Sequence, residues 1–170
     1  MTRYIALLRA VNVGGTGKLP MADLKAICLD AGFTRVKTYI ASGNVVFDSK
    51  GAASKVKAEL EARLLKYAKK PIGVVLRTAA EITAVLKANP FPKTEPKLTC
   101  AIFLDQRPPR DALEHIAGQN DEEVRLGTRE IFVHYPSGMG RTKLRIPAAK
   151  TGTARNMNTV AKLSEMAAKP

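Results

Sequence analysis

The side chains of this sequence that are best suited to binding an anion lie in a glycine-rich segment and just before it. Residues 14–18 read Gly-Gly-Thr-Gly-Lys and follow Arg9 and Asn12. A glycine-rich loop that enters a helix presents backbone N–H groups and the positive end of the helix dipole to a ligand. The segment therefore predicts a site for a small phosphorylated or carboxylated ligand, with candidate residues Arg9, Asn12, Gly14, Gly15 and Lys18. Glycines that serve turn geometry alone are the alternative.

The same segment lacks the complete pattern of a nucleotide-binding P-loop. That pattern needs a glycine five residues before the Gly-Lys pair, and Ser or Thr after the lysine to hold Mg²⁺. Asn12 and Leu19 occupy those two places. The sequence therefore argues against a nucleotidase of this type, and we expect no cofactor.

A second basic segment closes the chain. Residues 135–170 carry seven Lys or Arg and one Glu. Its candidate contacts with an anion are Arg141, Lys143, Arg145, Arg155 and Asn156, the last of which is also placed to cap a final helix. Our leading hypothesis is a non-enzymatic binding protein that contacts nucleic acid or another polyanion through this segment. A solvated surface whose basic side chains cover apolar residues is the alternative.

Net charge is the outlying property of the composition. The 170 residues include 28 Lys or Arg against 15 Asp or Glu, a formal charge of +13. Such a charge attracts phosphates and acidic partners, although it also keeps a protein dispersed in water. No apolar run approaches the roughly 20 residues that cross a bilayer. We expect a cytoplasmic protein without a membrane partner, and the oligomeric state stays open.

No arrangement of residues typical of catalysis or metal binding stands out. Ser42 has no histidine base nearby in the sequence, and His115 and His134 lack metal-ligand spacing to Cys or carboxylates. Cys28 and Cys100 are expected to be buried free thiols. We predict no metal site and favour a protein that is not an enzyme, while an enzyme acting at the glycine-rich loop stays open.

Apolar patterning predicts β-α-β-β-α-β in the first half of the chain, the order of a split βαβ or ferredoxin-like unit. Its expected strands are 3–8, 35–41, 44–48 and 72–77, and its expected helices begin at Pro20 and span 53–69. The second helix is predicted to bury Val56, Leu60, Leu64 and Tyr67. Thr78 and Glu81 predict a capping box that opens a third helix.

In this unit we expect strands 3–8 and 44–48 to run parallel at the centre of the sheet. The loop after the first strand and the Ser42-Gly43-Asn44 turn would then lie at opposite ends of the sheet and share no small-molecule site. Strands one and three of an RNA-recognition module stack bases on aromatic rings. Only Tyr4 and Phe47 stand in them here, which argues against that module.

The second half partly repeats this order. We predict a strand at 98–104, a helix at 110–118 that buries Leu113, a hairpin of 122–126 with 130–135, an irregular stretch and a helix at 156–168. The whole predicts an α+β fold of tandem ferredoxin-like halves, whose sheets are covered on both faces by packing against each other. The expected divisions are residues 1–88, a proline-rich connector at 89–97, and residues 98–170.

With these elements in place, the chain resembles the bacterial domain-of-unknown-function family number 1697. The matching stretches, in family order, are residues 6–15, 19–21, 38–47, 135–144 and 153–159. The resemblance implies a tandem ferredoxin-like α+β fold and cytoplasmic proteins without an established activity. Two departures are Met157, where the family usually has tryptophan, and a shortened stretch at 145–152; a site shaped by that region would be altered.

Overall fold

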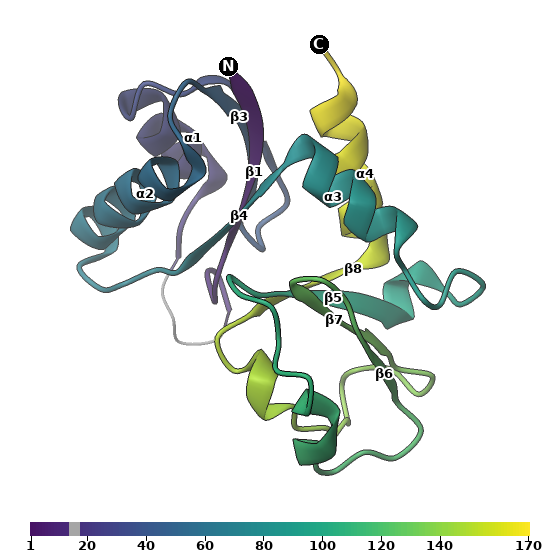
Figure 1. The fold of residues 1–170 in the computed structure, drawn as a ribbon. Coiled ribbons are helices and arrows are strands. Elements are labelled where there is room, and N and C mark those ends of the chain that lie inside the picture. Colours follow the sequence, from purple (N-terminus) through teal and green to yellow (C-terminus); the bar gives the residue numbers. More distant parts are fainter. Residues whose placement is uncertain (14–17) are drawn as a thin grey trace. The chain divides into compact units, whose positions relative to one another are not determined.

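Residues 1–13 and 18–170 are described by a computed structural model, in which they form an α+β protein with two four-stranded antiparallel sheets (Figure 1). Within these residues the chain has four α-helices. It divides into two compact units, Met1–Ile82 with Leu163–Pro170, and Thr83–Lys162. Each unit contains one of the sheets.

The first unit follows the predicted β-α-β-β-α-β order. Its elements are β1 (Thr2–Leu8), α1 (Met21–Asp30), β2 (Thr34–Tyr39), β3 (Asn44–Ser49), α2 (Ala53–Ala68) and β4 (Val74–Thr78). The strands are ordered β2-β3-β1-β4. Helix α3 (Ala79–Lys87) follows, opened by the predicted capping box, in which Thr78 N donates to Glu81 Oε1 and Glu81 N to Thr78 Oγ1.

The prediction that the first and third strands run parallel is wrong. β1 pairs with β3 antiparallel, with Leu7 opposite Asn44, and Leu8 N donates to Gly43 O at 2.9 Å. The reason is that α1 returns the chain across the sheet, so β2 runs in the direction of β1 and the short turn after β2 reverses β3. The loop after β1 and the turn before β3 therefore meet at one edge of the sheet.

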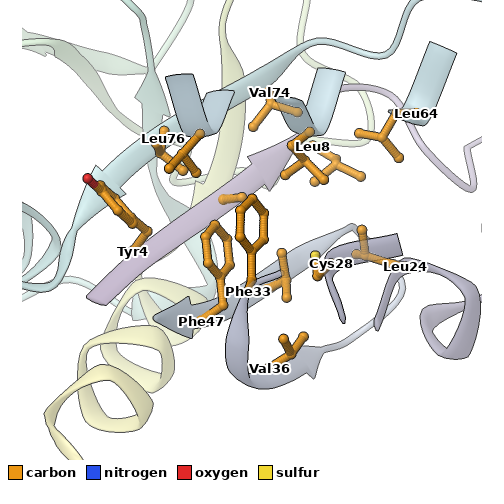
Figure 2. Packing of buried hydrophobic residues seen from close by; sticks show 14 of the residues in the cluster. Tyr4, Leu8, Leu24, Cys28, Phe33, Val36, Phe47, Leu64, Val74 and Leu76 are labelled. Carbon is orange, nitrogen blue, oxygen red and sulfur yellow. The ribbon is translucent and has the colours of Figure 1, made fainter. Parts of the chain in front are cut away.

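Helices α1 and α2 bury one face of this sheet. The core contains Tyr4 and Leu8 of β1, Leu24 of α1 and Leu64 of α2 (Figure 2). Phe47 of β3 is fully buried and its ring stacks on Phe33, with centroids 4.4 Å apart. The two aromatic side chains of the central strands, Tyr4 and Phe47, are thus core residues, and neither offers a ring face to a nucleic-acid base.

Arg3 ties the start of β1 to the end of the chain. Its guanidinium donates two hydrogen bonds to the Asp48 carboxylate, at 2.7 and 3.0 Å, and further bonds to Ala167 O and Lys169 O. The bond from Arg3 lowers the pKa of Asp48, as do the charges of Arg3 and Arg35. A cation at the carbonyl end of a helix is favourable, so Arg3 holds the last turn of the C-terminal helix in the first unit.

The second unit arranges its strands in the same relative order as the first. Its elements are β5 (Thr99–Phe103), β6 (Glu123–Leu126), β7 (Glu130–His134), β8 (Thr153–Asn156) and the start of α4, with short 3₁₀ turns at Pro96–Leu98, Ala112–His115 and Pro147–Ala149. Helix α4 (Met157–Ala168) belongs to this unit up to Lys162, and its later residues, whose carbonyl end Arg3 contacts, belong to the first unit. The order is β6-β7-β5-β8. The predicted hairpin is confirmed, since β6 pairs antiparallel with β7.

The predicted helix at 110–118 is reduced to the single 3₁₀ turn Ala112–His115. Ala117 exchanges backbone hydrogen bonds with Arg145, at 3.0 and 2.8 Å, and this pairing requires extended backbone where the helix would have continued. Leu113, predicted to be buried, is 39% exposed. A non-local backbone pairing thus overrides the local helical pattern.

Strand β8 was not predicted from the sequence. It buries Thr153 and Arg155 on one face, and an arginine at a buried strand position conceals the apolar alternation that identifies strands. Helix α4 starts directly after it. Asn156 Oδ1 accepts a hydrogen bond from Thr159 N at 2.9 Å, which confirms the predicted cap.

The two cysteines are buried free thiols, as expected. Burial raises the pKa of Cys28 to about 12 and that of Cys100 to about 11. No helix in the described part of the chain is long and apolar enough to span a membrane.

Replacing Gly43 by alanine tests how closely the turn before β3 packs against the chain after β1. A Cβ at Gly43 would lie 2.6 Å from Val11 Cγ2, and the backbone has φ +89°. Gly32 has φ +87° but open space around it, so Gly32→Ala measures backbone strain alone. We expect G32A to lower the free energy of unfolding by about 1–2 kcal/mol and G43A by about 2–4 kcal/mol in urea titrations. Equal losses would contradict the close approach.

The Arg3–Asp48 pair predicts a specific acid sensitivity. Because the folded pKa of Asp48 is lowered, its contribution to stability is present above the unfolded pKa of about 3.9 and is lost as pH falls through the folded value. Urea midpoints measured below about pH 4 should therefore fall less steeply in Asp48→Asn than in wild type. Arg3→Gln, which removes the partner, should flatten the profile in the same way; an unchanged slope in both variants would rule out the coupling.

Candidate anion-binding site

Asn12 makes side-chain hydrogen bonds to backbone groups of two other segments. Its Nδ2 donates to Leu19 O at 2.9 Å and to Ala41 O at 2.8 Å, and its Oδ1 accepts from Leu19 N at 2.6 Å. The residue has φ +57°, a left-handed conformation that asparagine tolerates well. Asn12, predicted as an anion contact, is therefore occupied with backbone groups, and it links the chain after β1 to Leu19 and to Ala41 of the turn before β3.

The turn before β3 completes this edge of the sheet. Asn44, fully buried, donates to Tyr39 O and to Ser42 Oγ at 2.9 Å each. Ile40 has φ +49° although it is β-branched, and it is 48% exposed. Left-handed backbone at non-glycine residues costs energy and is concentrated at functional regions of proteins. Ala10, Asn12 and Ile40 all adopt it here.

A pocket of about 570 Å³ lies at this edge, wholly within the first unit. We name it the basic pocket. Its polar lining is Arg9 after β1, Lys18 before α1, Tyr67 at the end of α2 and Lys70 between α2 and β4. Among the described residues that line the pocket there are three cationic side chains and no carboxylate. The local potential therefore favours an anion.

Arg9 is held on one wall of the basic pocket by the start of β4. Its backbone N donates to Gly73 O at 2.9 Å, and a Cβ added to Gly73 would lie 3.3 Å from Arg9 Cδ. The absence of a side chain at Gly73 thus leaves space for the aliphatic part of Arg9, which is half-buried.

Tyr67 lies at the pocket rather than in the core, so the prediction that it is buried is wrong. It is 43% exposed, and Ala68, four residues after Leu64, takes the inward position at the end of α2. The Tyr67 hydroxyl donates to Asp23 Oδ2 at 2.5 Å, and this bond raises the pKa of Tyr67. Asp23 belongs to the first turn of α1 and is not part of the pocket lining.

Arg9 and Lys18 line the same pocket, together with Tyr67 and Lys70, which the sequence analysis did not include. The available signal was strand order. β4 pairs with β1, Leu8 opposite Val74, so a cation shortly before β4 lies beside the end of β1. The candidates Gly14 and Gly15 lie outside the described residues.

The basic C-terminal candidates fall into two groups. Arg141 and Lys143 are exposed and line a pocket of about 340 Å³ in the second unit together with Asp121 and Glu122. Glu122 accepts hydrogen bonds from Thr142 Oγ1 at 2.5 Å and from Asn120 N at 2.7 Å, which lower its pKa. The carboxylates offset part of the positive charge there.

Arg155 and Asn156 serve the fold of the second unit. Arg155 is 6% exposed and donates to Thr153 Oγ1 at 2.6 Å and to Ala154 O at 3.0 Å. Burial lowers its pKa to about 10. Asn156 caps α4. Neither residue joins Arg141 and Lys143 in the lining of their pocket.

Among the described residues, no group of three or more His, Cys, Asp or Glu side chains is arranged to hold a metal ion. The chemistry available at the basic pocket is therefore that of its cations, its phenol and its apolar wall.

Comparison with known proteins finds a matching family model and a similar solved structure. The model of a family described as "Protein of unknown function (DUF1697)" matches residues 1–132. The solved structure of a conserved bacterial protein from Streptococcus pneumoniae is similar over 99% of each chain, with 25% sequence identity and a TM-score of 0.81. No curated protein matches. All four polar residues of the basic pocket fall inside the matched range, whereas Arg141 and Lys143 fall outside it.

Substitutions at Asn12 test how much its hydrogen bonds to Leu19 and Ala41 stabilise the protein. Asn12→Ala removes three hydrogen bonds and forces alanine into a left-handed conformation, whereas Asn12→Gly removes the bonds without backbone strain. In urea titrations we expect N12A to lower the free energy of unfolding by about 2–4 kcal/mol, and N12G to recover about 1 kcal/mol of that loss. Wild-type stability in N12G would show that the hydrogen bonds contribute nothing.

Proposed function

The chain belongs to the DUF1697 family, whose description assigns no activity, and from this premise we propose that it binds a small phosphorylated or carboxylated molecule in the basic pocket. The observation that carries the proposal is the convergence of Arg9, Lys18 and Lys70 on one pocket whose described lining holds no carboxylate. An anion bound in this pocket is attracted by all three charges at once. The volume of about 570 Å³ suits a small molecule.

The three cations come from three separate segments of the chain. Arg9 follows β1, Lys18 precedes α1 and Lys70 follows α2. Cations on different elements surround an anion from several directions, and such charge-assisted hydrogen bonds are about twice as strong as neutral ones. Lysines restricted to one solvated helix face would offer no comparable enclosure.

A second candidate is the binding of nucleic acid or another polyanion by the basic C-terminal segment, residues 135–170. It is favoured by the exposure of Arg141, Lys143 and Arg145 at alternating positions. We place it second because Arg155 is buried, and because Asp121 and Glu122 line the same pocket as Arg141 and Lys143.

We also propose that the two units are tandem ferredoxin-like halves with sheets covered on both faces, in a cytoplasmic protein. The shared strand order, second-third-first-fourth in each sheet, supports the tandem arrangement. Complete burial of the six residues of β3, which point alternately to both faces, supports the coverage. We further propose that the chain is divided into residues 1–88, a proline-rich connector at 89–97 and residues 98–170.

Calorimetric titration with inorganic phosphate, and with citrate as a carboxylate, tests the proposed function. Lys18→Gln and Lys70→Gln should each weaken binding about tenfold, the loss of one charge-assisted contact. Lys66→Gln is the matched control, because it makes the same charge change on an exposed residue of α2 that does not line the pocket. It should weaken binding less than twofold.

Absence of binding, or equal weakening in all three variants, would refute the basic pocket as the site. Oligonucleotide binding that falls with rising salt, is lost in Arg141→Gln with Lys143→Gln, and survives Lys70→Gln would instead support the second candidate.

A further inference from the structure

The described lining of the basic pocket is apolar as well as cationic. Besides the four polar side chains, the lining consists of alanine, valine, leucine, proline and isoleucine residues, with Val11, Leu19 and Ile72 forming part of it. These three side chains also belong to the core of the first unit, which fixes their positions, and at 3–8% exposure each presents only a small area to the pocket. The pocket thus joins a cationic part to a firm apolar surface, and its volume is many times that of a single phosphate ion.

The described lining contains no carboxylate or carboxamide side chain that could accept hydrogen bonds from a polyhydroxylated ligand. Sites that recognise sugar hydroxyls place planar carboxylate or amide groups against them, because an unmatched buried hydroxyl is costly. Asp, Glu, Asn and Gln are absent from the described lining residues. The one neutral hydroxyl in the lining, that of Tyr67, already donates its hydrogen to Asp23 at 2.5 Å. The uncharged part of the ligand therefore meets an apolar surface.

The Tyr67 ring is an exposed aromatic surface held in place at the pocket. The ring is anchored at one end by α2 and at the other by the hydroxyl bond to Asp23 of α1. The residue is nonetheless 43% exposed. A ring restrained at both ends loses little conformational freedom when a ligand packs on it, and aromatic stacking adds to the gain from burying apolar area.

We propose that the ligand of the basic pocket is an anion carried on a planar, largely apolar ring, with an aryl phosphate as the simplest example. The proposal rests on the proposed function and specifies its ligand class. The phosphate faces Arg9, Lys18 and Lys70, and the ring lies between Tyr67 and the apolar wall. Tyr67 is then a specificity residue, because it selects for the uncharged part of the ligand.

Calorimetric titration with three probes tests the ring. At equal ionic strength, 1-naphthyl phosphate should bind at least about tenfold more tightly than glucose 6-phosphate or inorganic phosphate. Equal affinities for naphthyl phosphate and glucose 6-phosphate, both sensitive to Lys70→Gln, would overturn the ring and leave the proposed function standing. Failure of all three probes to bind would overturn both.

Variants of Tyr67 test whether its ring is responsible for the preference for naphthyl phosphate over inorganic phosphate. Tyr67→Leu keeps apolar bulk and should lower the ratio of the naphthyl phosphate to the inorganic phosphate affinity about fivefold or more. Tyr67→Phe keeps the ring and should retain most of that ratio. Leu65→Ala is the matched control, since Leu65 is an exposed apolar residue of α2 outside the pocket, and it should leave the ratio unchanged. An unchanged ratio in folded Tyr67→Leu would overturn the role of Tyr67.

Discussion

The antiparallel pairing of β1 with β3 is the constraint on which the arrangement of the first unit depends. It sets Leu7 opposite Asn44 and brings Leu8 N to Gly43 O, so the ends of two central strands meet at one edge of the sheet. There the turn before β3 approaches the chain after β1 so closely that no Cβ fits at Gly43. Asn12 completes the junction through its bond to Ala41 O. The basic pocket lies at this junction. Strand β4 pairs with the other side of β1, so Lys70, which precedes β4, also lines the pocket.

Arginine residues occupy different environments at the two ends of β1. Arg3, at its start, is paired with Asp48 and with carbonyl groups of the chain end, so its charge is used within the fold. Arg9, just after its end, lines the basic pocket. In the second unit Arg155 is buried in strand β8. The formal charge of +13 is therefore a poor guide to function by itself, because cations in neutralised, buried and pocket positions contribute to it equally.

Local signals predicted the elements they directly specify. Apolar periodicity identified α1 and α2, and the capping residues Thr78 and Asn156 act as their types and positions indicate. The predictions were wrong for two elements of the second unit. The helix at 110–118 gave way to a backbone pairing with Arg145, nearly thirty residues later, and β8 escaped detection because Arg155 occupies one of its buried positions. The direction of β3 relative to β1 was also predicted wrongly, although it follows from connectivity once the helix between them is counted as one reversal.

For the candidate site, residue types and their order along the chain selected Arg9 and Lys18, which line the same pocket. That this pocket binds an anion is our proposal. Residue types and their order were also sufficient to identify the family, to which the matched range of residues 1–132 assigns the chain. The inclusion of Tyr67 and Lys70, the use of Asn12 as a backbone clamp and the burial of Arg155 were decided by the tertiary structure. The physical reason is that a side chain's type determines what it can bind. Whether the side chain bonds to other groups within the fold or lines a pocket depends on which distant strands and helices pack beside it.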